Sequence, residues 1–256
     1  MIRRPHRSKL RINPAFFAGE LRLLLADEPE RHERLLNDPD SLDLLVWNVF
    51  ASLDTHRDRD WLAYRMQALG GPAVRAPTRL SLWTGRRREP LLACSPAYVR
   101  WLRERTRATG AGARELAIFT DPIEVPVRVE SPDVLVLVDA ALATVPRGNG
   151  GRDRLVELVD AGLEHARRLS SSLAVAFMCA SGTQAAEELS SRVDELSDPV
   201  RLAEELPWRH ELPPVVLRAI SWQELLGVWK SEIRYLRLDG QPVRAFLDHA
   251  RRRGLL

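Results

Sequence analysis

The 256-residue sequence has only two cysteines, Cys94 and Cys179, which lie far apart in the chain. Two isolated thiols provide neither a disulfide framework nor the paired ligand spacing of a zinc site. The histidines are scattered, with no pair at i, i+4 and no cysteine pair beside them. These absences argue against a structural zinc site and favour a reducing, cytoplasmic setting.

Long apolar runs are also missing from the sequence. No stretch approaches the roughly 18 residues that a membrane-spanning helix needs. The basic start, residues 1–12, leads into no apolar segment of the kind that directs export. We therefore expect a protein without a membrane span, and 45% hydrophobic with 29% charged residues suits one large buried core.

Lysine is scarce, because Lys9 and Lys230 are the only two and arginine supplies the rest of the 38 basic side chains. The net charge of +3 is mildly basic. An arginine bias often follows genome composition, so by itself it is weak evidence for nucleic-acid binding. The positions of the arginines carry more information than their number.

Two groups of arginines are candidates for contact with phosphates. The first group is three consecutive residues after an expected strand, and the second recurs at i, i+3 and i+7 on one face of an expected helix. They are Arg86, Arg87 and Arg88, and Arg100, Arg103 and Arg107. Arginine contacts to phosphates would make nucleic-acid binding salt-dependent. The alternative is a solvated arginine surface without a ligand.

The first half of the chain has mainly helical periodicity, with apolar residues at i, i+3 and i+4. The expected helices cover residues 14–26, 28–36, 41–56, 61–69 and 95–107. Gly70 and Gly71 suit the end of the fourth helix, and Ser95 with Pro96 suits the start of the fifth. One short strand is expected within this half, at residues 78–83.

The second half alternates strands and helices. Two β-rich runs flank a turn at residues 131–133 and form an apolar hairpin from Ile123 to Leu142. The other expected elements are helices at 153–169, 183–196, 199–206, 222–229 and 242–253, and strands at 173–179 and 215–220. This order predicts an α/β fold with a central mixed sheet flanked by helices.

No internal repeat or linker divides the chain. We expect a basic tail over 1–12, a mainly helical part over 13–115 and an α/β core over 116–256, with 40–115 joining the core in one compact domain. The glycine-rich loop at 148–151 precedes a helix but lacks the lysine and the Ser or Thr of a P-loop. A plain connection explains this loop better than a phosphate site.

The hairpin carries a resemblance to a known family. Residues 124–141 resemble the core of the PD-(D/E)XK, or restriction-endonuclease-like, nuclease superfamily. Supporting segments follow in the expected order, at 44–50 in an early helix, 79–85 before the core and 219–225 near the end. The resemblance implies a restriction-endonuclease-like fold with a helical N-terminal extension.

The departures from the family pattern lie at its catalytic positions. The resemblance assigns a helix glutamate, the metal-binding aspartate, the second carboxylate and the lysine to Leu42, Pro126, Asp139 and Ala141. Such nucleases need hard oxygen ligands for Mg²⁺ and a lysine beside the attacking water. Because three of the four positions carry no charge, we expect all four to be vestigial, with no bound metal or other cofactor.

Three alternatives stay open. An active Mg²⁺-dependent nuclease could use Asp139 with Glu124 or Glu130, since the two-residue strand period places both glutamates on one face with Pro126. A purely structural subunit would bind no nucleic acid. Ala141 alone would also fit an engineered knockout, although proline and leucine at the other positions favour natural loss.

The sequence therefore predicts a catalytically inactive PD-(D/E)XK homologue that acts by binding. The expected partner is either nucleic acid, through the arginines, or a protein, including a second copy of the chain. The resemblance implies a bacterial setting in anti-phage defence or DNA processing. Pro126 further predicts a bend or bulge in its strand, because proline donates no ladder hydrogen bond.

Overall fold

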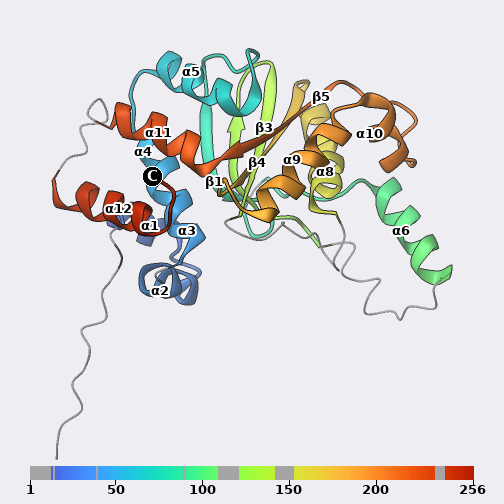
Figure 1. Cartoon of the computed structure of the whole chain (residues 1–256). Helices are drawn as coiled ribbons and strands as arrows, with labels where there is room; N and C mark the ends of the chain where they lie inside the picture. The colour runs from blue at the N-terminus through green and yellow to red at the C-terminus, as the bar shows by residue number, and fades with distance from the viewer. Residues whose placement is uncertain are drawn as a thin grey trace, which may run out of the picture.

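The protein is described by a computed structural model over residues 13, 15–38, 40–88, 90–108, 121–141, 153–233 and 240–256. The described chain forms a five-stranded mixed sheet with helices on both faces (Figure 1). In sheet order the strands are β1 (Arg79–Thr84), β2 (Val125–Glu130), β3 (Val134–Ala140), β4 (Ser172–Cys179) and β5 (Val215–Ser221). β1, β2 and β3 are antiparallel neighbours, and β4 and β5 continue the sheet in parallel. The expected α/β class and central mixed sheet are confirmed.

Two sets of helices cover the two faces of the sheet. The first set is α1 (Ala18–Leu24), α2 (Pro29–Asn37), α3 (Leu42–Val46), the π-helical turn η1 (Trp47–Ala51), α4 (Ser52–Asp54), α5 (Arg59–Gly70), α11 (Trp222–Glu232) and α12 (Gln241–Arg252). The second set is α8 (Arg154–Leu169), α9 (Gln184–Leu196) and α10 (Pro199–Glu205). α6 (Pro96–Ala108) projects to one side, at the right of Figure 1. In the part of the chain that the structure describes, every helix is too short or too polar to cross a bilayer.

Strands β3 and β4 are buried on both faces because helices cover the sheet from both sides. In β3, Val136 and Val138 pack into the core on the α5 side, whereas Leu135 and Leu137 pack into the core on the α8 side. A strand covered on both faces has no solvated side. This burial explains why the sequence of β3 is an apolar run and not an alternation of apolar and polar residues.

The end of α5 lies close against the sheet. A Cβ at Gly70 would stand 2.5 Å from Val136 Cγ2, so the missing side chain lets the helix approach β3. Gly71 then ends the helix with φ 80°, in a region that favours glycine. The predicted helix end at these two glycines is confirmed.

The N-terminal helix begins later than its apolar spacing predicts. α1 starts at Ala18, after Phe17 in the left-handed region with φ 49°. The backbone N–H of Phe16 donates to the buried Asn48 side chain in η1 at 2.8 Å. The prediction of a helix from residue 14 is therefore wrong at its start, because a contact 32 residues away holds this segment outside the helix.

The predicted hairpin is present as β2 and β3. Val127 pairs with Val138, and the Ser131 N–H donates to the Val134 carbonyl at 3.0 Å across the turn. On the other side of β2, the ladder passes from Leu82–Val127 to Thr84–Val125 and skips the position of Pro126. Trp83, opposite that gap, has φ 48°. The irregularity expected at Pro126 therefore lies in the β1–β2 ladder.

Candidate functional site

Two acidic residues meet at the end of the hairpin where β2 begins and β3 ends. Glu124 directly precedes β2, and Asp139 lies one ladder step beyond the pair Val127–Val138, next to Pro126. Glu130 instead pairs with Leu135 at the turn end of the hairpin. At about 3.3 Å per residue, four ladder steps separate Glu130 from Asp139 by roughly 13 Å. Of the two glutamates considered as replacement ligands, the structure brings Glu124 to the end that holds Asp139.

Asp139 is buried, with 6% of its surface exposed, and it is paired with an arginine. Arg154 Nε donates to Asp139 Oδ2 at 2.8 Å, and Arg154 Nη2 donates to the Glu124 carbonyl at 2.6 Å. Arg154 is the first residue of α8, whose N-cap Asp153 accepts from the Leu155 N–H at 2.8 Å. The capped helix start thus holds the guanidinium against the end of the hairpin.

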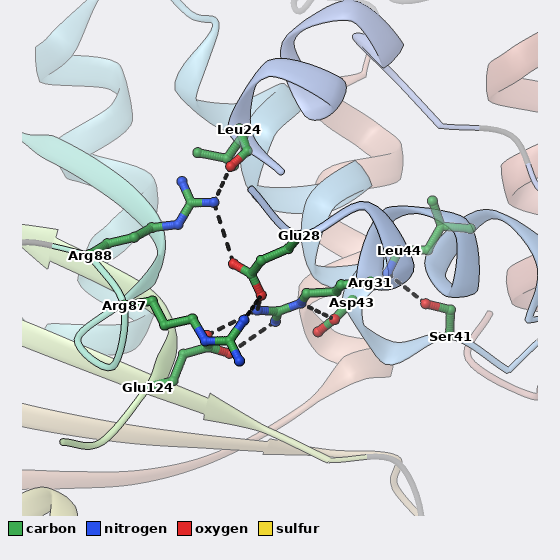
Figure 2. Close-up of polar contacts among 9 residues, drawn as sticks. All are labelled: Leu24, Glu28, Arg31, Ser41, Asp43, Leu44, Arg87, Arg88 and Glu124. Atoms are coloured by element: carbon green, nitrogen blue, oxygen red, sulfur yellow. Dashed lines mark hydrogen bonds and ion pairs between the residues drawn. The ribbon is translucent and has the colours of Figure 1, made fainter. Parts of the chain in front are cut away.

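Glu124 is paired with a second arginine, from α2. Arg31 donates through both Nη atoms to the two carboxylate oxygens of Glu124, each at 2.9 Å, and through Nε to Asp43 at 2.8 Å (Figure 2). Glu28 lies 3.5 Å from the same guanidinium. We call Glu28, Arg31, Asp43 and Glu124 the Arg31 cluster. It joins α2, α3 and the start of β2 through one planar group of fixed donor geometry.

The protonation of Arg31 follows from this surrounding. Burial opposes its charge, but hydrogen bonds to Asp43 and Glu124 outweigh the loss of solvation and raise the pKa of Arg31 above its ordinary value. The guanidinium also lies 4.8 Å from the centre of the Trp83 ring, a favourable cation–π position. Arg31 is therefore a permanent cation among three carboxylates.

The loop after β1 joins the same region. Gly85 has φ 115°, and a side chain there would collide with the Ile123 carbonyl, so glycine lets the loop lie against the start of β2. Arg87 and Arg88 approach Glu28 at 3.4 and 3.7 Å, and Arg88 donates to the Leu24 carbonyl (Figure 2). Two of the three consecutive arginines thus make contacts within the protein. Arg86 and Arg87 line a polar cavity of about 560 Å³ beside the Arg31 cluster.

The positions to which the resemblance assigns the helix glutamate and the lysine are occupied by packing residues. Leu42, half-buried, begins α3 and packs against the core, and the next residue, Asp43, faces Arg31. Ala141 is buried, and its carbonyl accepts from Trp222 Nε1 at 2.8 Å. The early helix therefore contributes a carboxylate one residue later than the resemblance assigns it. The sequence carried no signal for this role, because an acidic residue in a first helical turn is common.

The side chains at the end of the hairpin that holds Glu124 and Asp139 do not fit a catalytic magnesium ion. Mg²⁺ needs near-octahedral oxygen coordination by carboxylates and water, whereas the carboxylates of Glu124 and Asp139 accept from Arg31 and Arg154. Pro126 has no oxygen on its side chain, and Ala141 has no amine. Among the described residues, no group of three or more acidic, histidine or cysteine side chains is placed to hold a metal.

The second arginine group has a different setting. Arg100, Arg103 and Arg107 lie exposed along α6 and line one side of an open groove that also contains Cys94. No acidic side chain in the described parts of the chain forms an ion pair with any of the three. We call these residues the α6 arginine face. Its positive charges are directed toward solvent.

A buried aspartate fixes the base of α6. Asp160 of α8, fully buried, accepts from the Ser95 N–H at 2.6 Å and from Arg209 Nε at 2.7 Å. Ser95 Oγ in turn accepts from the Tyr98 N–H at 3.1 Å, as expected for a helix cap. Sequence reasoning missed Asp160, because a lone acid in an amphipathic helix gives no sign of its partners. The α6 arginine face is therefore held in a defined position on the core.

Two segments considered in the sequence, the basic tail at 1–12 and the glycine-rich loop at 148–151, lie outside the described residues. Comparisons of the chain with protein-family models, with curated proteins and with solved structures found no match. The site's geometry is therefore the basis on which a function can be assigned.

Proposed function

We propose that this protein is a catalytically inactive nuclease homologue of the restriction-endonuclease-like type that acts by binding nucleic acid. The observation that carries the proposal is the pairing of Asp139 with Arg154 and of Glu124 with Arg31. A metal ion would have to displace both guanidinium groups before it could reach these carboxylates. The order of hairpin, helix and parallel strand, β2–β3–α8–β4, supports the assignment of the scaffold.

The α6 arginine face is the proposed binding surface. Its three side chains follow one helix face, and Ser95 and Asp160 hold the start of that helix in place. Exposed arginines of this spacing suit consecutive phosphates of a nucleic-acid backbone. Arg86 and Arg87 supply further positive charge beside the polar cavity at the hairpin end. Arg88 is a weaker candidate, because it already donates within the protein.

A cleavage assay tests the loss of activity. We expect the wild type to cut neither duplex DNA nor single-stranded DNA nor RNA in Mg²⁺ or Mn²⁺. Asp139→Ala should show the same background. Cleavage by the wild type that Asp139→Ala abolishes would overturn the proposal and establish the active-nuclease alternative.

A salt titration of binding tests the α6 arginine face. The triple variant Arg100→Gln, Arg103→Gln, Arg107→Gln should bind duplex or single-stranded nucleic acid more weakly than the wild type. Its log–log salt slope should fall by about 2 to 3, since each lost phosphate contact removes roughly 0.7 to 0.9.

The matched control removes three exposed arginines elsewhere, Arg167→Gln, Arg168→Gln and Arg201→Gln, which pair with Glu164 or Glu204. This control changes the net charge equally and should leave most of the affinity and the slope intact. Equal losses in both triples would mean a non-specific charge effect. A wild type that binds no nucleic acid at any salt concentration would favour a protein partner or a structural role.

A further inference from the structure

A second cavity, of about 290 Å³, lies between α5, β5 and α11. Its walls are mostly apolar and include Leu53, Met66, Leu225 and Trp229. Ligand pockets in proteins are typically apolar with a few placed polar groups, and about 300 Å³ is the lower end of their volumes. The cavity therefore has the size and lining of a site for a small molecule.

Two arginines reach into this apolar setting. Arg65 comes from α5 and Arg218 from β5, and the Nε atoms of both are buried without a hydrogen-bond acceptor. A buried donor without an acceptor costs about 1–3 kcal/mol, so such groups normally have a partner. Arg218 thus gives the cavity wall a guanidinium without an acceptor among the described residues, which points to an acceptor supplied by a ligand.

One of the two arginines at the cavity has no acidic partner in contact. Arg65 pairs with Glu232 at 2.7 Å. Glu224 caps α11, where one of its oxygens accepts from the N–H and the hydroxyl of Ser221, each at 2.9 Å. Arg218 forms no ion pair with any residue that the structure describes. The two arginines and two glutamates of the cavity wall balance in formal charge, and Arg218 is the arginine of this wall that contacts no carboxylate among the described residues.

Gly71 makes room for that charge. A Cβ at Gly71 would lie 3.3 Å from Arg218 Nη2, and Gly71 has φ 80°, so any other residue would be strained and would crowd the guanidinium. The turn that ends α5 thus passes directly beside Arg218. The absence of a side chain at Gly71 therefore leaves room for the Arg218 guanidinium beside the turn.

We infer that this cavity binds a small carboxylate with an apolar body. The carboxylate would accept from Arg218, and the hydrocarbon part would pack against Met66, Leu225 and Trp229. A single guanidinium without a contacting carboxylate suits a monoanion better than a phosphate dianion, and the apolar walls disfavour a bare inorganic ion. Two sources share this chemistry, a free organic acid and the C-terminal carboxylate of a peptide. This inference is independent of the nucleic-acid proposal.

Calorimetric titration with hexanoate and benzoate tests the site, with hexanol, hexylamine and inorganic phosphate as controls of charge and shape. Saturable binding of at least one acid, with weaker or no binding of the controls, is the expected result. A peptide ending in a free leucine carboxylate, compared with its amidated form, distinguishes the two sources. No saturable binding of hexanoate, benzoate or the free peptide, or equal binding of hexanol and hexanoate, would overturn the inference.

Two variants test the site, one by removing the positive charge of Arg218 and one by filling the cavity. Arg218→Gln should weaken acid binding at least about 10-fold, because a charge-assisted hydrogen bond is lost, whereas the exposed Arg201→Gln should bind like the wild type. Ala68→Trp changes an exposed residue of α5 that lines the cavity and keeps both arginines. It should also abolish binding, by filling the space. Undiminished affinity in Arg218→Gln, or in Ala68→Trp if the arginine variant fails to fold, contradicts the site.

Discussion

Arg31 and Arg154 lie at the hairpin end with side chains only 12% exposed, and each donates to carboxylates of the same chain. Arg100, Arg103 and Arg107 lie exposed on α6 and form no ion pair with the described residues. The residue type is the same in both regions. Burial and partners decide whether an arginine holds the fold together or is available to an external phosphate.

The contacts of the buried arginines also bear on the proposed loss of nuclease activity. A divalent ion can gather carboxylates from several elements and also activate water. The Arg31 guanidinium gathers carboxylates from α2, α3 and the start of β2, but it has no open coordination position for water. Under the proposed function, charge balance at this end is retained while the means of cleavage is absent.

The largest effect is expected from the buried pair Arg154–Asp139 at the hairpin end. Arg154→Met should lower the free energy of unfolding by about 3–5 kcal/mol, because the buried Asp139 carboxylate loses its partner. Urea unfolding at pH 7 measures the loss. The double variant Arg154→Met, Asp139→Leu should recover much of it, since no buried charge then remains unpaired. A cost below about 1 kcal/mol for the single variant, the range of exposed pairs, would contradict the structural role of Arg154.

A smaller loss is expected at the Arg31 cluster. Arg31→Met removes charge-assisted hydrogen bonds to Glu124 and Asp43 and should cost about 2 kcal/mol of stability. The matched control is Arg59→Met, whose partner is Asp54 and whose pair is exposed at 43% and 38%. This control should cost at most about 1 kcal/mol. Equal midpoints of the two variants in urea would remove the distinction between buried and exposed arginines drawn above.

A third buried arginine, Arg128, makes the role of buried arginines testable through the pH dependence of stability. Arg128 Nη2 donates to His165 Nε2 at 2.8 Å, so the imidazole is neutral, and Arg128 also pairs with Glu130. Burial, followed by the charges of Arg128 and Arg168, lowers the pKa of His165 to about 4. Between pH 6.5 and 4 the unfolded state therefore binds more protons than the folded state, and stability falls as the pH is lowered.

The measurement for His165 is the urea midpoint at pH 7.5 and pH 4.5. We expect a loss on the order of 1–2 kcal/mol over this interval from His165 alone. His165→Gln should reduce the pH dependence by that amount, and the exposed His210→Gln should leave it nearly unchanged. An identical pH dependence in the wild type and His165→Gln would show that the imidazole is not held neutral by its surroundings.

The smallest effect on stability is expected at the α6 arginine face. The triple variant Arg100→Gln, Arg103→Gln, Arg107→Gln should change the free energy of unfolding by no more than about 0.5 kcal/mol, because exposed side chains without partners contribute little. The thermal midpoint and the urea midpoint both test this. A loss of more than 1 kcal/mol would mean that these arginines hold α6 in place, and their availability to phosphates would then be in doubt.

Much of the fold could be predicted from local patterns. The apolar runs of β3 and β4, the turn between β2 and β3 and the helix capped by Asp153 all follow from properties of neighbouring residues. The apolar spacing predicts the start of α1 too early, because the contact of Phe16 with Asn48 joins residues that are distant in sequence. The expectation at Pro126 placed the irregularity in its strand without indicating that Trp83 would adopt positive φ.

The sequence by itself determined the class of the fold, the hairpin and the absence of charge at three of the four positions that the resemblance assigns. Tertiary structure decided which charges meet, since Arg31 and Glu124 are 93 residues apart and no periodicity links them. It also decided that Glu124 lies at the same hairpin end as Asp139 while Glu130 lies at the other. Periodicity assigns a side chain to a face, whereas an ion pair depends on the distance between elements that only packing sets.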